Sequence, residues 1–256
     1  MSEAPPRATA AAAGTARTLR VCALYPDLMN IYADRGNLLM LERRCAWRGI
    51  GFRLGASGLG EELDGEAHDL FYLGGGQDRD QRLCAEDLLA RKRDGLRRAA
   101  ARGAVVLGIC GGYQLLGHSY TLGEEEIEGV GLLDVRTVRS AASRLIGNVA
   151  IQTRLAGSRV LAGFENHGGR TWLGADAEPL GRVLRGHGND GRSGFEGAQA
   201  GNTLGTYLHG PLLPKNAWFA DWLIARALGV EERELAPLED ELERRAHAEA
   251  CGVAGL

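Results

Sequence analysis

The chain has no apolar run that approaches the roughly 20 residues needed to cross a bilayer. Its start, MSEAPPRATAAAAGTARTLR, is small and polar and has no apolar centre, so the sequence predicts no secretion signal. It also has no CxxC pair, and its cysteines have no histidines at metal-ligand spacing. We therefore expect reduced thiols in a cytoplasmic protein without a metal. The five cysteines are Cys22, Cys45, Cys84, Cys110 and Cys251.

Lysine is nearly absent, since only Lys92 and Lys215 occur, and arginine carries almost all the positive charge. The formal net charge is −3, so the chain lacks the excess of basic residues that is typical of a nucleic-acid-binding protein. Neither lysine stands in a GxxxxGK[ST] loop, so the sequence has no such ATP-phosphate site.

The composition is that of an ordinary globular protein, with 45% hydrophobic and 25% charged residues in a chain of 256. The Ala/Pro-rich residues 1–17 predict a disordered leader. We expect a main domain over residues 18–230 and a charged helical tail over residues 231–256.

The first half of the chain alternates apolar strands with helices. Helices are predicted at residues 34–48, where Leu38, Leu41 and Cys45 form an apolar stripe, and at 78–102. Strands that are apolar nearly throughout indicate an α/β fold whose mostly parallel sheet is covered by helices on both faces. Those strands are expected at residues 19–26, 51–55, 68–76 and 104–110.

The second half is richer in glycine, and its apolar segments are typical of strands separated by turns. A helix is predicted over residues 216–228, with Trp218, Trp222 and Ala225 on one side. The segments expected as strands are LLDVRTV, LIGNVAIQT, VLAGFENHGG and NTLGTYLHG.

The segment Gly108-Ile109-Cys110-Gly111-Gly112 has the spacing of a nucleophile elbow, a sharp turn between a strand and a helix. We expect Cys110 in a strained conformation, with the free backbone N–H groups of the helix favouring its thiolate form. The Gly111 N–H would then face a developing oxyanion. A buried structural cysteine ahead of a glycine-rich helix is the alternative interpretation.

A second glycine cluster, Gly74-Gly75-Gly76, ends another predicted strand. The carboxyl ends of parallel strands share one edge, where ligands bind, so the Gly75 N–H is a candidate for the second oxyanion donor. A simple tight turn is the alternative.

A nucleophilic thiolate needs a general acid/base, for which histidine is the usual choice. His209 is a candidate because it follows a predicted apolar strand and precedes Gly210 and Pro211. His167, in FENHGGR, is the alternative, although a structural role near the site suits it better. The remaining histidines lie in polar segments or at helix ends and are expected at the surface, namely His68, His118, His187 and His247.

Four motifs in order, LGGGQDR, GICGGYQLLG, FENHGGRT and LGTYLHGPLLPKN, resemble the class I glutamine amidotransferases of the cobyric-acid-synthase-like (CobB/CobQ-like) branch. With YPDLMNIYADRGN, the chain is most similar to the GatD-type glutaminase subunits of lipid II isoglutaminyl synthases. The similarity runs from about Leu19 to Ala227. It implies a flavodoxin-like class I glutamine amidotransferase fold.

The resemblance also implies roles for individual residues. Cys110 matches the nucleophile of the family and His209 its partner. Arg144 matches the arginine that holds the substrate, whose α-carboxylate a guanidinium can grip through two hydrogen bonds. Gln114 and Gly75 match positions at the glutamine pocket, and Gly75 and Gly111 would form the oxyanion hole.

The sequence departs from the wider class after His209, where Gly210 and Pro211 replace the common Pro-Glu. The acid that would orient the imidazole is therefore missing locally. A distant Asp or Glu, or a partner subunit, would have to supply it, and we favour the partner.

By resemblance, the chain hydrolyses L-glutamine and passes ammonia to a Mur-ligase-like (MurT-type) synthetase subunit in a heterodimer. That subunit would use ATP and Mg²⁺ to amidate the D-glutamate α-carboxyl of lipid II at the cytoplasmic face of the membrane, while this chain would need no cofactor and would not insert into the bilayer. The alternatives are a cobyric-acid-type amidotransferase subunit, a cysteine hydrolase on the same fold, and a non-catalytic scaffold.

Overall fold

The computed structural model describes residues 17–31 and 35–256. All but the last residue of the expected disordered leader, residues 1–17, lies outside the described residues. Asp34, the predicted first residue of a helix, lies outside them as well. None of the helices in the described part of the chain is long and apolar enough to cross a membrane.

A six-stranded sheet forms the centre of the molecule, in the order β13-β14-β4-β3-β1-β2. Every neighbouring pair is parallel except β13 with β14. The carboxyl ends of five strands therefore lie at one edge, as expected for a ligand site in an open α/β sheet. The strands are β1 (Thr18–Leu24), β2 (Gly51–Ser57), β3 (Leu70–Leu73), β4 (Val105–Ile109), β13 (Ala198–Ala200) and β14 (Thr203–Thr206).

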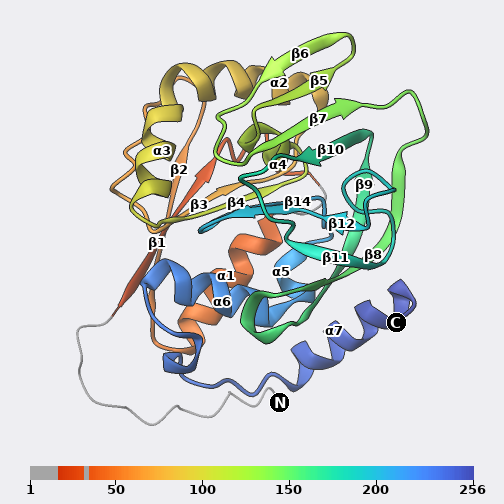
Figure 1. Ribbon diagram of the computed structural model, residues 1–256. Helices are drawn as coiled ribbons and strands as arrows, with labels where there is room; N and C mark the ends of the chain where they lie inside the picture. The colour runs from red at the N-terminus through yellow and green to blue at the C-terminus, as the bar shows by residue number, and fades with distance from the viewer. Residues whose placement is uncertain (1–16, 32–34) are drawn as a thin grey trace.

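Helices cover both faces of this sheet (Figure 1). In β4, Leu107 is buried in one core cluster with residues of α1 and α6, whereas Val106 belongs to a second cluster with residues of α2 and α3. Because successive side chains of a strand point to opposite faces, an apolar strand of this kind buries both faces. The helices are α1 (Arg35–Trp47), α2 (Asp78–Asp87), α3 (Arg93–Ala101), α4 (Gly111–Leu116), α5 (Leu212–Lys215) and α6 (Ala217–Leu228).

The predicted helical region at residues 78–102 is confirmed as one continuous helical stretch. It comprises α2, a π-helical segment η1 (Leu88–Lys92) and α3. The predicted stripe of α1 is also confirmed, since Leu38, Leu41 and Cys45 are all buried. The predicted α/β class is therefore correct, and it follows from local apolar periodicity.

The second half of the chain adds two four-stranded sheets, in the orders β10-β7-β5-β6 and β12-β11-β8-β9. Buried residues of the first sheet belong to the core cluster of α2 and α3, whereas those of the second belong to the cluster of α1 and α6. The antiparallel pair β8–β9 places Leu145 opposite His167. This pairing brings the segment that contains Arg144 next to the FENHGGRT motif. The strands are β5 (Ser119–Leu122), β6 (Glu125–Glu128), β7 (Val135–Arg139), β8 (Leu145–Thr153), β9 (Val160–His167), β10 (Gly169–Leu173), β11 (Gly181–Arg185) and β12 (Phe195–Glu196).

The C-terminal helix α7 (Glu241–Ala254) packs against β8, β9 and α5. A buried ion cluster fixes the segment that precedes α7 in the sequence. The Arg44 side chain on α1 donates both to Asp221 on α6 and to Asp240, the residue before α7. Two short 3₁₀ helices complete the chain, η2 (Leu155–Gly157) and η3 (Glu232–Glu234).

Candidate active site

Cys110 occupies the sharp turn between β4 and α4. Its backbone angles are φ 52° and ψ −105°, outside the regions that residues with a side chain normally adopt. The Cys110 N–H donates to the Thr206 carbonyl at 2.8 Å, which ties the turn to the neighbouring strand β14. The side chain is partly exposed, so the alternative of a fully buried structural cysteine does not hold. The strained turn matches the geometry expected of a nucleophile elbow.

The elbow packs directly on the second glycine cluster. The Gly112 N–H donates to the Gly74 carbonyl at 3.1 Å, and a Cβ on Gly112 would lie 2.1 Å from the Leu73 carbonyl oxygen. A Cβ on Gly111 would lie 3.2 Å from the backbone nitrogen of Gly76. Glycine is therefore required at position 112, where two chain segments approach too closely for a side chain.

Gly75 and Gly111, the predicted oxyanion donors, lie on these two adjoining segments. Both residues are buried, and the Gly75 carbonyl accepts from the Ile31 N–H at 3.2 Å. Gly76, rather than Gly75, lines the cavity that contains Cys110. The assignment of Gly75 and Gly111 as donors stays a prediction.

His209 lies beyond the carboxyl end of β14, next to the strand that carries Cys110. Thr206 pairs with Ile109 in register, so both chain segments leave the sheet at the same edge. His209 is buried and forms an isolated antiparallel bridge with Phe164, with its N–H donating at 2.8 Å and its carbonyl accepting at 3.2 Å. The topology supports a joint site, and the role of His209 stays a prediction.

A cavity of about 80 Å³ is lined by Arg144 and Gln114, two of the three predicted substrate residues. Cys110, Gln114, Arg144 and His167 all line it, although they come from α4, the segment before β8 and the end of β9. His209 does not line this cavity. Three of the motifs recognised in the sequence therefore contribute residues to one cavity.

Arg144 lies at the mouth of this cavity with an exposed side chain. Its Nε donates to Asn166 Oδ1 at 2.8 Å, and its Nη2 donates to the Asn166 carbonyl at 2.7 Å. These two bonds orient the planar guanidinium, which can then present its remaining N–H groups to a carboxylate. Substrate binding by Arg144 stays a prediction.

Gln114 is held in the cavity wall by hydrogen bonds at both ends of its amide. Its Oε1 accepts from Gln81 Nε2 at 2.7 Å, and its Nε2 donates to the Tyr207 hydroxyl at 3.2 Å. The Tyr207 hydroxyl is also bonded to Thr171 Oγ1 at 2.7 Å. Gln114 is therefore a fixed part of the cavity wall, because its amide has partners on both sides.

Sequence reasoning did not identify Gln81, Asn166 or Tyr207 as parts of the site. Tyr207 stands two residues before His209, and Asn166 directly precedes His167, so both lie inside motifs that were recognised. Gln81 is one helical turn beyond Gln77, which follows the glycine cluster. The proximity of these three residues to recognised motifs is the signal in the sequence that could have identified them.

His167 is buried at the end of β9, with its ring stacked on the Tyr207 ring at a centroid distance of 3.6 Å. Its Nδ1 lies 2.9 Å from the Gly169 carbonyl oxygen. Burial lowers the pKa of His167 to about 3, so the imidazole is neutral at physiological pH. The expected position near the site is confirmed, and the residue forms part of the cavity wall.

Glu165 and Glu196 carry two buried carboxyl groups that accept hydrogen bonds from the backbone. Glu165 accepts from the backbone N–H groups of His187 and Gly188 at 2.6 and 2.9 Å. Glu196 accepts from Thr206 Oγ1 at 2.9 Å and from the Tyr207 N–H at 2.7 Å. The bonds of Glu196 hold the end of β14, and those of Glu165 hold the backbone after β11. The origin of the acid that would orient His209 stays a prediction.

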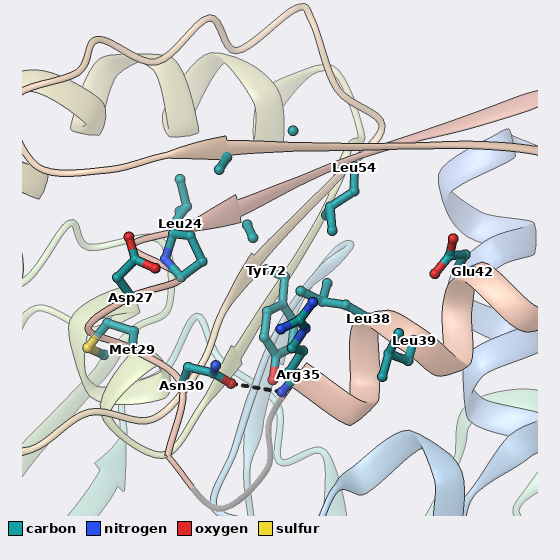
Figure 2. Close-up of a pocket in the computed structure, with 14 residues that line it drawn as sticks. Leu24, Asp27, Met29, Asn30, Arg35, Leu38, Leu39, Glu42, Leu54 and Tyr72 are labelled. Atoms are coloured by element: carbon teal, nitrogen blue, oxygen red, sulfur yellow. Dashed lines mark hydrogen bonds between the residues drawn. The ribbon is translucent and has the colours of Figure 1, made fainter.

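A larger cavity of about 440 Å³ lies between α1 and the ends of β1, β2 and β3. Figure 2 shows Leu38 and Tyr72 beside it, with Asn30 Oδ1 accepting from the Arg35 N–H at 2.9 Å. Met29 and Asn30 line this cavity, whereas Ile31 lines the one at Cys110, so one segment separates the two. Among the described residues, the wall of the larger cavity has neither cysteine nor histidine, which makes the smaller one the candidate active site.

Comparison with known proteins shows the family of this chain. A family model for the CobB/CobQ-like glutamine amidotransferase domain matches residues 20–217. The chain is 39% identical over 229 residues to the GatD subunit of lipid II isoglutaminyl synthase (glutamine-hydrolyzing) from Staphylococcus aureus (strain N315), covering 89% of this chain and 90% of that one. The corresponding subunit of Streptococcus pneumoniae (strain ATCC BAA-255 / R6) is 38% identical over 211 residues, covering 82% and 80% of the two chains.

More distant relatives share a part of their length or only their fold. Cobyric acid synthase of Pelotomaculum thermopropionicum is 39% identical over 181 residues, which cover 63% of this chain and 33% of that protein. A chain in the structure of PurLQS from Thermotoga maritima superposes with a TM-score of 0.54 at 19% identity, covering 90% of this chain and 98% of that one. It supports the predicted amidotransferase fold. The chain therefore belongs to the CobB/CobQ-like family of glutamine amidotransferases, and within it to the GatD subunits of lipid II isoglutaminyl synthases.

Proposed function

We propose that this chain hydrolyses L-glutamine through a thioester on Cys110 and supplies the ammonia to a synthetase subunit that amidates lipid II. The observation that carries the proposal is the placement of a strained, partly exposed cysteine in the same cavity wall as Arg144 and Gln114. The GatD subunits of two bacteria, similar along most of the chain, support the choice of pathway.

The reaction begins when the Cys110 thiolate attacks the side-chain carboxamide carbon of glutamine. The carbonyl oxygen becomes an oxyanion, and the backbone N–H groups of Gly75 and Gly111 are the donors proposed to bind it. His209 gives a proton to the departing nitrogen, so the C–N bond breaks and ammonia leaves. A γ-glutamyl thioester remains on Cys110.

Water completes the cycle. His209 takes a proton from the water as it attacks the thioester carbonyl, and the C–S bond breaks to release glutamate and regenerate the thiolate. Arg144 holds the α-carboxylate of the substrate throughout, while Gln114, fixed by Gln81 and Tyr207, shapes the pocket around the side chain.

The second half of the reaction belongs to a partner chain. Joining ammonia to a carboxylate requires an activated acyl group, so we propose a Mur-ligase-like subunit that binds ATP and Mg²⁺ and acts on the D-glutamate α-carboxyl of lipid II. The two chains would work in the cytoplasm as a heterodimer. We also propose that the partner supplies the acid that orients His209, which would make hydrolysis slow in the isolated chain.

The test is to purify the tagged chain with the proteins bound to it, identify them, and assay ammonia release from L-glutamine. We expect a Mur-ligase-like companion, glutamine hydrolysis by the complex, and much slower hydrolysis by the isolated chain. Cys110→Ala should abolish hydrolysis and leave assembly intact. Unchanged hydrolysis in that variant would reject the proposal, and full activity of the isolated chain would reject the partner-supplied acid.

The alternative acceptor is a cobyrinate, because cobyric acid synthases match part of this chain. That match covers only 33% of the synthase from Pelotomaculum thermopropionicum, whereas the GatD match covers 90% of the staphylococcal subunit. Transfer of ammonia by the purified complex to lipid II, but not to a cobyrinate, would decide between the two.

A further inference from the structure

Strands β7 and β10 have one face that is largely open to solvent. In this antiparallel pair Val138 lies opposite Arg170, and Arg136 lies opposite Trp172. Side chains of a strand alternate between its two faces, so these four residues share one face, while the intervening Thr171 is buried on the other. Trp172 is 50% exposed and Val138 is 47% exposed. The outer face of the pair therefore combines arginine with exposed apolar surface.

A groove of about 480 Å³ adjoins this face, and we call it the β7–β10 groove. It is lined by Val138, Arg170 and Trp172 from the sheet. Leu145, at the start of β8, and Arg192, in the loop after β11, also line it. The β7–β8 connection and the loop after β11 both carry exposed residues, so another molecule can reach the groove.

The charged side chains around the groove are mainly arginines, since three arginines and one aspartate line it. Asp190 Oδ1 already accepts three hydrogen bonds from its own loop, and Arg139 pairs with Asp78 at 3.0 Å. Arg170 donates to three carbonyl oxygens. Neither Arg170 nor Arg192 has a carboxylate partner in the described part of the chain, so the groove holds two positive charges without counter-ions.

The groove is the immediate neighbour of the candidate active-site cavity. Arg139 lines both of them. Arg170 Nη2 donates at 2.8 Å to the carbonyl of Ser143, the residue before Arg144. Its Nη1 donates at 3.2 Å to the carbonyl oxygens of residues 168 and 169, which also line the cavity. A molecule bound in the groove would therefore lie against the segments that carry the proposed substrate arginine.

The chemistry of the groove suits a protein partner. Tryptophan and arginine are enriched in protein interfaces and among the residues that contribute most to binding. Arginines beside apolar surface are complementary to a segment that carries acidic and apolar side chains. Ammonia released into water diffuses away and becomes protonated, so the chain that consumes it is expected to dock beside the site that releases it. The proposed function supplies such a chain, the synthetase subunit.

We propose that the β7–β10 groove is the docking site for an acidic, partly apolar segment of the synthetase subunit. Carboxylates of that segment pair with Arg192 and Arg170, and an apolar side chain packs on Trp172. This inference rests on the proposed function and adds to it the surface and the chemistry of the contact.

The test measures the Kd between the full chain and the co-purified synthetase subunit for Trp172→Ala and Arg192→Glu. Trp47→Ala is the matched control for the first, because Trp47, at the end of α1, is 49% exposed. Arg53→Glu is the control for the second, because Arg53 is an exposed arginine on β2. A photo-crosslinking residue, p-benzoylphenylalanine, placed at position 172 or at position 47 then maps the contact in the assembled complex.

We expect Trp172→Ala and Arg192→Glu each to raise the Kd by roughly 10- to 100-fold, the usual effect at a central interface residue. The effect of Arg192→Glu should shrink as the salt concentration rises, since salt screens the charge pair. Both controls should bind as the wild type does. The crosslinker at position 172 should attach to a peptide of the synthetase subunit that is rich in Asp and Glu, and the one at position 47 should not attach to that subunit.

A wild-type Kd for Trp172→Ala and Arg192→Glu would overturn the inference, and so would a crosslink from position 172 to a basic peptide or to none. An unchanged Kd with slower amidation of lipid II would also overturn it, by assigning the groove to the lipid substrate. Failure of the wild-type chain to bind a synthetase subunit or to hydrolyse glutamine in its complex would instead reject the proposed function. The two failures are therefore distinguishable.

Discussion

At the scale of single residues, Cys110 combines partial exposure with backbone strain. Its φ of 52° places a side chain where glycine is favoured, which typically costs about 1–3 kcal/mol. The turn persists because the Cys110 N–H is bonded to β14 and the Gly112 N–H to Gly74. The surrounding fold therefore holds the thiol at the sheet edge against its local preference.

This strain predicts an unusual order of stability among variants of Cys110. Cys110→Ala keeps a Cβ at the strained position, whereas Cys110→Gly removes it. We expect the glycine variant to be more stable than the alanine variant by about 1 kcal/mol, although glycine is normally the more flexible residue. Urea unfolding of the two variants measures the difference, and a more stable alanine variant would contradict the strain.

The raised pKa of Glu196 predicts that the stability of the protein depends on pH. Burial raises the pKa of this carboxyl to about 8, more than the hydrogen bonds from Tyr207 and Thr206 lower it. In the unfolded chain the pKa is near 4.3, so between about pH 4.5 and 8 the unfolded state loses a proton that the folded state keeps. The contribution of Glu196 to the free energy of unfolding therefore falls as the pH rises through that range.

Glu196→Gln replaces the titrating carboxyl with an amide of nearly the same shape. We expect the variant to gain stability relative to the wild type as the pH increases from 5 to 8, by at least about 1.4 kcal/mol, the equivalent of one pKa unit. Urea unfolding at both pH values measures this change. Glu86→Gln, at an exposed position, is the control, and parallel pH profiles for wild type and Glu196→Gln would contradict the assignment.

At the scale of elements, α4 and the Gly74–Gly76 segment form one packed unit. The close approach at Gly112 predicts that Gly112→Ala displaces α4 from the end of β3, because the added Cβ would meet the Leu73 carbonyl at 2.1 Å. We expect a loss of more than about 2 kcal/mol in unfolding free energy, together with a loss of glutaminase activity.

Gly252 in α7 provides the matched control for that substitution. It is also a helical glycine, but a Cβ there meets no atom within 4 Å. Gly252→Ala should stabilise the protein by about 0.5–1 kcal/mol, since alanine favours helix. Thermal unfolding of both variants tests the pair, and similar effects at the two positions would contradict the packing argument.

The elements show which parts of the site the sequence could predict. The turn at Cys110 depends on neighbouring residues, so its GxCxG spacing was sufficient. The contact of Arg144 with Asn166 depends instead on the pairing of β8 with β9, and the amide network of Gln114 depends on β14 lying beside β4. Strand order is a long-range property, which local periodicity does not determine.

At the scale of the whole molecule, the Arg44 cluster joins three distant segments. Arg44 is fully buried, and its side chain bonds to Asp221 on α6 and to Asp240 in front of α7. Removing one partner of a buried ion pair leaves uncompensated charge. The cluster therefore couples the C-terminal helix to the body that carries the site.

We expect Arg44→Met to lower the free energy of unfolding by about 3 kcal/mol, because Asp240 would lose its buried cation and Asp221 would keep only Arg48. It should also increase proteolysis of the segment that contains α7. Arg43→Met is the control, since Arg43 is the adjacent, exposed residue of the same helix. Equal stability of the two variants would show that the cluster is not a structural connection.

The central claim at this scale is that glutamine is cleaved through a covalent bond to Cys110. The most direct measurement is mass spectrometry of the complex, acid-quenched during turnover of L-glutamine and digested into peptides. We predict the mass of a γ-glutamyl group on the peptide containing Cys110, and its absence from Cys110→Ala. Continued turnover by Cys110→Ala, or the adduct on another residue, would contradict the account.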